Sequence, residues 1–377
     1  MLSKVLFWGS LGALGWTQLG YPVAAAALAR RRGRPVRKRE IEPSVTVVVA
    51  AHDEEDVIER RLENLLALDY PGDRLEIVVA SDASTDRTDD TVEAIAEGEP
   101  NVRLLRCPRG GKVAAQNRAV EASESEIVAF TDANAQWKAD ALRKLVRNLA
   151  DPQVGYVCGG HFYEAAGGTN RESTYWKFEA WLRRNESALG SITGGIGPIY
   201  AVRRSDYLPL DASAGPGHDL VFPYRMVQRG RRAVFEPEAV AWEKPSRDIE
   251  DEYRRRQRMF RQSWHVVLHG GMLRAQPPLY KFQLVSHRHL RYASGLLHCV
   301  LLVTALGLAR RGTVYRVAAG TQLAWLALAA AGRLRLRVPA ASIAYYHVAI
   351  TWGTLAALVR YLQDGAPAVW EKTEGTR

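Results

Sequence analysis

The chain has 377 residues, enough for one large domain with membrane segments or for two domains. Its mean hydropathy of −0.20 excludes a transporter built only of membrane spans. The formal net charge of +10 comes largely from two basic segments, residues 30–39 and 254–261. There is no domain-wide basic face with interleaved aromatic residues, so we expect no nucleic-acid partner. The three cysteines, Cys107, Cys158 and Cys299, have no metal-binding spacing, and no chemistry is assigned to them.

An apolar segment opens the chain and is long enough to cross a bilayer. The basic run RRRGRPVRKR follows it, with seven Arg or Lys between Arg30 and Arg39. A cleaved signal peptide is the alternative, but such peptides carry their positive charge before the apolar region, where this chain has only Lys4. The order predicts a membrane anchor over residues 1–29 and a basic linker over residues 30–43, on the cytosolic side near anionic lipid headgroups.

Three apolar segments of strand type follow, and each ends in acidic residues. They are SVTVVVAAHDEED (44–56), RLEIVVASDASTDRTDD (74–90) and IVAFTDANAQ (127–136). Open α/β sheets keep their ligand sites at the carboxyl ends of their strands. We therefore predict an α/β domain over residues 44–246. The candidate ligand residues at its strand ends are Asp53, Glu54, Asp82, Asp132 and Asn134.

A segment with one basic and one apolar flank follows the predicted domain. At 100° per residue, residues 248–273 place several arginines on one flank and apolar residues on the other, as in a helix on a membrane surface. We assign residues 247–291 to interfacial helices. Residues 292–362 contain three apolar segments, near 292–309, 314–331 and 340–362, which predict three membrane helices and leave residues 363–377 as a tail. Buried core helices are the alternative, and the loop holding Arg310 and Arg311 conflicts with the positive-inside rule if all three segments cross.

The motifs AHDEE, SDASTD, GGK (110–112) and TDAN, in this order, resemble the nucleotide-sugar-binding half of inverting family 2 glycosyltransferases of the GT-A type. The later segments GGIGPIYAVRR (194–204), HDL (218–220) and RRRQRMFRQSW (254–264) are similar to acceptor-side segments of the membrane-bound branch, which includes cellulose, chitin, hyaluronan and poly-N-acetylglucosamine synthases. The resemblance implies a Rossmann-like mixed sheet. It also implies sugar transfer from a nucleoside diphosphate sugar, with a UDP-sugar favoured, to a hydroxyl of a glycan or lipid-linked acceptor.

The resemblance assigns the donor to the first half of the domain. Asp53, Glu54 and Asp82 are expected to accept hydrogen bonds from the base or the ribose, and Lys112 to contact the donor. Asp132 and Asn134 are the expected ligands of Mg²⁺ or Mn²⁺, which prefer oxygen donors. Two positions depart from the family pattern: Asp53 stands where Asn is usual, and Asn134 where Asp is usual. Solvated or helix-capping carboxylates are the alternative for the loop positions.

On the acceptor side, the resemblance makes Asp219 the general base, with His218 in place of a preceding acid. Capping of a helix is the alternative for Asp219. Gly194 and Gly195 are expected to let the acceptor approach the backbone. Arg258, Arg261 and Trp264 stand near the place where processive relatives carry Gln-x-x-Arg-Trp, although that pentad is absent. The two arginines are expected either to balance the leaving diphosphate or to face lipid.

Two other functional classes remain open at this point. Asn134, His218 and the missing pentad are compatible with a degenerate, non-catalytic relative that binds nucleotide sugar or lipid as an assembly partner. A sugar-phosphate nucleotidyltransferase would need a basic glycine-rich motif at the first strand, and residues 50–56 contain no Lys or Arg. The transferase hypothesis requires that Asp132 and Asp219, which are far apart in the sequence, meet at one site.

Overall fold

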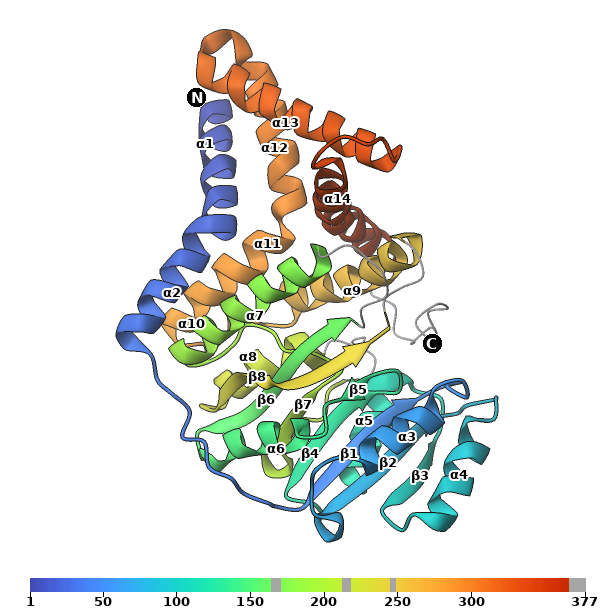
Figure 1. Cartoon of the computed structure of the whole chain (residues 1–377). Helices are drawn as coiled ribbons and strands as arrows, with labels where there is room; N and C mark the ends of the chain where they lie inside the picture. Colours follow the sequence, from blue (N-terminus) through green and yellow to red (C-terminus); the bar gives the residue numbers. More distant parts are fainter. Residues whose placement is uncertain (164–170, 212–217, 245–248, 366–377) are drawn as a thin grey trace.

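The computed structural model describes the whole chain except residues 164–170, 212–217, 245–248 and 366–377. Its described residues form one mixed eight-stranded sheet in the order β3-β2-β1-β4-β7-β6-β8-β5 (Figure 1). The strands are β1 (Val45–Ala51), β2 (Leu75–Asp82), β3 (Val102–Cys107), β4 (Ile127–Asp132), β5 (Gln136–Trp137), β6 (Val154–Tyr163), β7 (Tyr200–Arg203) and β8 (Arg232–Glu243). The prediction of an α/β domain with a mixed sheet is confirmed.

The first half of the sheet is parallel. β1 lies between β2 and β4, β3 pairs with β2, and all these pairs are parallel. These strands read as nearly continuous apolar runs because helices cover both faces of a parallel sheet, and every residue of β1 is buried. β7 runs antiparallel to both β4 and β6, so the strand direction reverses there. The carboxyl ends of β1, β2 and β4 therefore share one edge.

Helices connect the strands and pack on the sheet. They are α3 (Ile58–Leu66), α4 (Thr88–Gly98), α5 (Gly111–Glu121), α6 (Ala141–Val146), α7 (Arg171–Leu189) and α8 (His218–Gln228). Short 3-10 turns lie at Gly72–Arg74, Arg147–Ala150 and Arg204–Asp206. α3 shows why such a helix docks: Ile58, Leu62 and Leu65 are spaced to lie on one face, and all three are fully buried in the main core.

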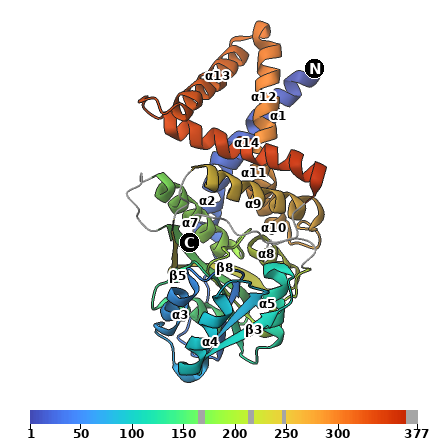
Figure 2. The same ribbon diagram turned by 90° about the vertical axis from the view of Figure 1, so that its right-hand side faces the viewer.

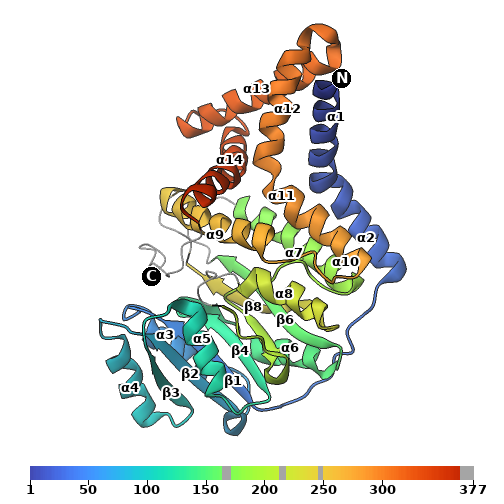
Figure 3. The same cartoon turned by 180° about the vertical axis from the view of Figure 1, so that it is seen from behind.

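A second group of helices lies on one side of the sheet and projects away from it (Figures 1 and 3). Residues 2–32 are helical throughout, as α1 (Leu2–Gly15), a π-helical turn (Trp16–Gly20) and α2 (Tyr21–Arg32). The later helices are α9 (Ile249–His269), α10 (Pro278–Gln283), a π-helical turn (Leu284–His289), α11 (Leu290–Tyr292), α12 (Ser294–Leu308), a 3-10 turn (Ala309–Arg311), α13 (Thr313–Arg333) and α14 (Ala341–Asp364). α1 and α12 run side by side, with Phe7 and Leu14 packed near Leu301 and Leu308. In Figure 2, α14 lies next to α9, between it and the projecting helices.

Two helices in the described part of the chain are long and apolar enough to cross a membrane, Ser294–Arg311 and Ala341–Asp364. They match the first and third of the predicted C-terminal spans. The predicted middle span is helical as α13, and the predicted anchor is helical over residues 2–32 with the π-helical turn inside it. Membrane crossing by all four segments, and the multi-pass topology with it, stays a prediction.

Candidate active site

Asp82 ends β2 and organises the loop that leads into α5. Its carboxylate is fully buried and accepts hydrogen bonds from the backbone N–H groups of Gly110 at 2.7 Å and Gly111 at 3.0 Å. The Arg109 guanidinium donates to the same carboxylate at 2.5 Å. Charge-assisted hydrogen bonds of this kind fix a loop firmly. In this structure Asp82 therefore sets the start of α5, and its contact with a nucleotide stays a prediction.

Lys112 lies in the first turn of α5 and pairs with Asp132. Asp132 is the last residue of β4, next to Ala50 of β1 in the sheet register. The Lys112 ammonium donates to the Asp132 carboxylate, and both side chains keep about a quarter of their surface exposed, 20% and 27%. The loop that Asp82 holds thus brings the GGK lysine to the TDAN aspartate. A cation and a carboxylate that face partly outward can both reach a charged substrate.

Asp53 and Glu54 tie the loop after β1 to the loop after β2. Asp53 has a positive φ of 53°, and its carboxylate accepts the backbone N–H of Thr85 at 2.7 Å. Asn and Asp tolerate this left-handed conformation better than most residues, so the backbone conformation by itself favours Asp at position 53. Glu54 is buried, and its backbone N–H donates to the Thr88 hydroxyl at 2.8 Å. The donor contacts expected of both residues stay predictions.

Two residues of α3 hold the TDAN loop in place. Arg61 is fully buried and donates to the Thr131 hydroxyl at 2.9 Å and to the Asn64 amide oxygen at 2.5 Å. Asn64 in turn accepts the Trp137 backbone N–H at 2.8 Å and donates to the Trp137 carbonyl at 2.9 Å. Burial lowers the pKa of Arg61, and the charge of Asp132 opposes that shift. Residues 131–137 are therefore anchored at both ends by one helix.

Asp219, on α8, interacts electrostatically with Lys112 and Asp132. It lies in the first turn of α8, and its carbonyl oxygen accepts the Gly195 N–H at 2.5 Å. Burial raises the pKa of Asp219 and the Asp132 charge adds to the rise, whereas Lys112 and Arg288 lower it. The structure thus brings Lys112, Asp132 and Asp219 close enough for their charges to interact. A carboxylate with a raised pKa is suited to accept a proton near neutral pH.

The structure shows a local packing reason for glycine at positions 194 and 195. A Cβ at Gly194 would collide with the Arg288 guanidinium, and a Cβ at Gly195 would collide with the Tyr156 hydroxyl. The space that the missing side chains leave is therefore used by these two residues of the protein itself. The approach of the acceptor to this backbone stays a prediction.

Arg261 and Trp264 connect α9 to α14. Their hydrogen bonds are not with Lys112, Asp132 or Asp219. The Trp264 indole N–H donates to the Thr354 carbonyl at 2.9 Å, and its ring packs near Ala357 and Tyr361. Arg261 donates to the Gly365 carbonyl at 2.7 Å. Arg258 is half-buried on the same helix, and the side chain of His218 lies outside the described residues. The acceptor roles expected of all four remain predictions.

A divalent cation fits the Asp132 site only together with a substrate. Asp132 and Asn134 supply one carboxylate and one amide, and no group of three His, Cys, Asp or Glu that could hold a metal occurs within the described ranges. Mg²⁺ is commonly held by one or two carboxylates plus substrate phosphates rather than by a cage of protein ligands. The donor set present here is compatible with that arrangement.

Sequence reasoning missed Arg61 and Arg288. A signal existed for Arg61, because it stands between Ile58 and Leu62 on the apolar face of its helix, where a charged residue is unexpected. No local pattern pointed to Arg288, whose neighbours at the site come from distant parts of the chain.

The sequence and the fold were compared with known proteins. Residues 46–208 match the family model of glycosyl transferase family 2. A β-monoglucosyldiacylglycerol synthase of Nostoc is 30% identical over 220 residues, which are 55% of this chain and 45% of that protein. A poly-β-1,6-N-acetyl-D-glucosamine synthase of Staphylococcus aureus is 25% identical over 207 residues, 52% of this chain and 49% of that protein. The chain thus spans about half the length of these curated relatives.

One solved structure is similar over nearly the whole chain. A mannosyltransferase from Pyrobaculum calidifontis, solved with GDP-Man and Mn²⁺, superposes with a TM-score of 0.72 at 26% identity. The similarity covers 96% of this chain and 98% of that one. Its extent includes the projecting helices as well as the sheet. The resemblance inferred from the motifs is confirmed: residues 46–208 form a family 2 glycosyltransferase domain with the GT-A fold.

Proposed function

We propose that this chain is a membrane-bound inverting glycosyltransferase. It moves a sugar from a nucleoside diphosphate sugar to a hydroxyl group of a lipid-linked or glycan acceptor. The observation that carries the proposal is that Lys112 pairs with Asp132 and that both charges act on Asp219 at the start of α8, which combines a cation, a candidate metal ligand and a candidate base of raised pKa. A degenerate binding protein would have no need of a carboxylate with a raised pKa at this place.

The chemistry is a single displacement at the anomeric carbon. The acceptor oxygen forms a bond to that carbon while the bond from the carbon to the diphosphate oxygen breaks, and the electron pair leaves with the diphosphate. Asp219 takes the proton of the acceptor hydroxyl, and attack from the face opposite the leaving group inverts the configuration. Lys112 supplies positive charge on the donor side. A bound Mg²⁺ or Mn²⁺, held by Asp132 and Asn134 with the diphosphate, would neutralise the charge that develops on the leaving group.

The distribution of exposed apolar side chains supports membrane attachment. Between residues 24 and 163 no large apolar side chain is exposed, whereas such side chains are frequent on α1 and α12–α14. Examples are Leu2, Leu6, Trp8, Val303, Leu306, Val317, Leu326, Trp352 and Leu362. Soluble proteins rarely expose so much contiguous apolar surface. We place these helices in the cell membrane, with the basic linker and the catalytic domain in the cytosol.

The acceptor class follows from this attachment. A catalytic domain held against a bilayer meets lipid headgroups and lipid-linked sugars at high local concentration. The similarity to a β-monoglucosyldiacylglycerol synthase points the same way. The donor is a nucleoside diphosphate sugar whose base, uracil or guanine, is the first question for experiment, since the Pyrobaculum mannosyltransferase was solved with GDP-Man.

A donor screen in native-like membranes tests the proposal. We expect the purified full chain to release UDP or GDP from one sugar nucleotide in the presence of lipid acceptor, and to lose that activity in chelator. Asp219→Asn should reduce turnover by about 10³-fold, in the middle of the range for loss of one acid–base group, while donor binding stays intact. Asp140→Asn, in a surface ion pair with Lys138, is the matched control. Donor binding without turnover for any acceptor would establish the assembly-partner alternative instead, and full activity in chelator would remove the metal role of Asp132.

A further inference from the structure

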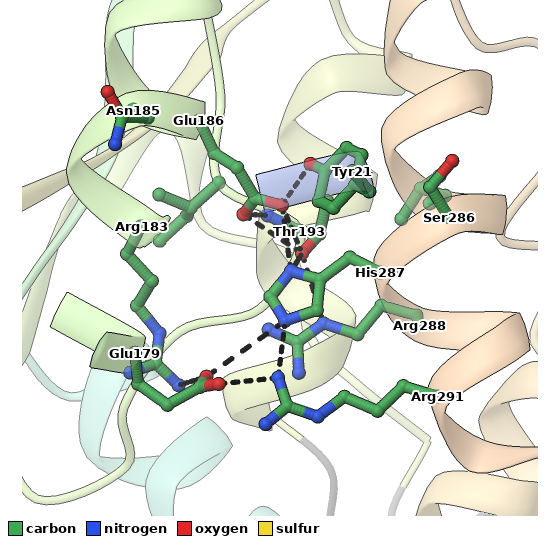
Figure 4. A network of polar contacts seen from close by, with 12 residues as sticks. Tyr21, Glu179, Arg183, Asn185, Glu186, Thr193, Ser286, His287, Arg288 and Arg291 are labelled. Atoms are coloured by element: carbon green, nitrogen blue, oxygen red, sulfur yellow. Dashed lines mark hydrogen bonds and ion pairs between the residues drawn. The ribbon is translucent and has the colours of Figure 1, made fainter. Parts of the chain in front are cut away.

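A cluster of buried polar side chains lies between the sheet and the projecting helices (Figure 4). We call it the polar network and define it by eight residues. They are Tyr21, Glu179, Arg183, Glu186, Thr193, His287, Arg288 and Arg291. Its members come from α2, α7, the loop before β7 and the segment 287–291, so it joins the N-terminal helix to the acceptor-side loop.

Glu186 is the centre of the network. Its carboxylate is fully buried and accepts hydrogen bonds from the Tyr21 hydroxyl at 2.5 Å and the Thr193 backbone N–H at 3.1 Å. The His287 ring nitrogen Nδ1 lies 2.7 Å from the same carboxylate. The Arg291 Nη1 lies 3.0 Å from the other ring nitrogen, Nε2, which must accept because a guanidinium can only donate, so the ring carries its proton on Nδ1 and is neutral. Burial lowers the pKa of His287 in the same sense. Glu186 is thereby satisfied without help from Arg288.

Glu179 is satisfied by two other guanidinium groups. Arg291 donates to its carboxylate, and Arg183 lies 3.7 Å from it. Burial alone would raise the pKa of Glu179, but these two cations outweigh it and hold the pKa well below its usual range. With two carboxylates and three guanidinium groups, the polar network carries one positive charge in excess.

The excess charge is that of Arg288. Its Nε donates to the Thr193 hydroxyl at 3.1 Å, which fixes the direction of the side chain. Its Nη2 is buried and has no hydrogen-bond partner among the residues that the structure describes. The guanidinium lies over Gly194, whose missing side chain makes room for it, and it interacts electrostatically with Asp219. A buried donor with no partner is unfavourable, so such groups usually bind a ligand or water.

We propose that Arg288 binds a phosphate oxygen of a substrate beside Asp219, and that the polar network holds it in position for this contact. The inference rests on the proposed function and adds a residue that the motifs did not indicate. A guanidinium matches phosphate better than an ammonium does, because its planar fork donates two parallel hydrogen bonds. The phosphate belongs either to the donor diphosphate or to a phosphate-bearing lipid acceptor.

Binding and rate measurements on Arg288→Gln and Arg288→Lys test the inference and separate the two sources. Arg291→Gln is the matched control, since it removes a guanidinium from the same polar network but one that is paired with Glu179. The probes are UDP and GDP against uridine and guanosine, and a polyprenyl phosphate against diacylglycerol in vesicles. Thermal unfolding of each variant reports structural damage. Arg288→Lys should recover only part of any loss.

If Arg288 contacts the donor, Arg288→Gln should weaken binding of the nucleoside diphosphate at least tenfold and leave nucleoside binding unchanged. This loss of affinity should be larger than the loss caused by Arg291→Gln. An acceptor contact predicts unchanged nucleotide binding and a KM at least tenfold higher for the polyprenyl phosphate but not for diacylglycerol. Unchanged values for all probes would overturn the inference. So would a loss that Arg291→Gln reproduces, or a mere shift of the pH profile. If the wild type binds no nucleoside diphosphate, the proposed function fails at that step, before any variant is compared.

Discussion

The donor side of the site and the polar network solve the same problem in different ways. Both hold buried carboxylates with cations and backbone N–H groups. On the donor side, Asp82 and its partners at 109–111 belong to one strand–loop–helix succession. In the polar network, the partners of Glu186 come from residues as distant as Tyr21 and His287. The first arrangement is local and readable from motifs, whereas the second exists only after the helices dock.

The comparison implies that damage to the donor side impairs chemistry, whereas damage to the polar network first impairs docking of the helices. Within the comparison of these two regions, the largest expected effect is that of Asp132→Asn. Removing the only carboxylate at the end of β4 should reduce kcat by at least about 10²-fold and abolish stimulation by Mn²⁺. Initial rates over a Mn²⁺ titration measure both. Stimulation that persists in the variant would place the cation elsewhere.

Asp82→Asn should come next. The amide keeps one acceptor oxygen but loses the charge that Arg109 and two N–H groups share, so the loop before α5 loosens and Lys112 is misplaced. We expect kcat/KM to fall about 10–100-fold, equivalent to roughly 1.4–2.7 kcal/mol. Steady-state kinetics check this, with Asp73→Asn on the surface as control. Wild-type kinetics in Asp82→Asn would show that the loop holds its shape without this carboxylate.

Arg61→Met separates positioning from stability. Methionine fills a similar volume, and Thr131 and Asn64 keep other partners, namely the Pro198 carbonyl and the Trp137 backbone. The hydrogen-bond partners of Arg61 are neutral and Asp132 keeps Lys112, so the substitution leaves no buried charge unpaired and we expect the free energy of unfolding to change by less than about 1 kcal/mol. Activity should nevertheless fall about tenfold, because a catalytic loop held less firmly misplaces Asp132. Arg60→Met, on the exposed side of α3, is the control, and equal rates in the two variants would contradict the idea.

The polar network should contribute to the stability of the fold and to the dependence of that stability on pH. Tyr21→Phe removes one hydrogen bond to Glu186 and should lower stability by about 1 kcal/mol with little change in rate. The folded-state pKa of His287 lies below its ordinary value of about 6.5, so the unfolded chain binds more protons there. The resulting stability is present at neutral pH and is lost as the pH falls below about 6.5.

Burial alone would raise the pKa of Glu186, but His287 and Arg288 outweigh it and lower that pKa. The stability that Glu186 contributes is therefore lost only below its ordinary pKa of about 4.5. Thermal unfolding between pH 7.5 and 5 measures the loss due to His287 alone, with Glu179, Arg183 and Arg291 as the other charges facing the ring. A stability that does not decline over this range would contradict a neutral His287.

The sheet and the candidate donor residues at its edge could be predicted from the sequence. Apolar strands that end in acidic residues predict an open α/β sheet, and Asp82, Lys112 and Asp132 could be named in advance because each lies within a few residues of a strand end or helix start. The local order of the chain fixes such positions. Periodicity also located the helices of the second half, and the helical structure of residues 2–32 follows the predicted anchor.

The contacts of the acceptor-side residues follow from the packing of distant helices. The resemblance assigned Arg261 and Trp264 to the acceptor, which stays a prediction, and the structure shows that both contact α14, because two apolar helix faces pack together there. Arg288 and Glu186 carried no motif at all. They came together because burying the faces of α2, α7 and the segment 287–291 against one another required each buried charge to find a partner. That requirement acts through space, so no local pattern in the chain could show which residues would meet.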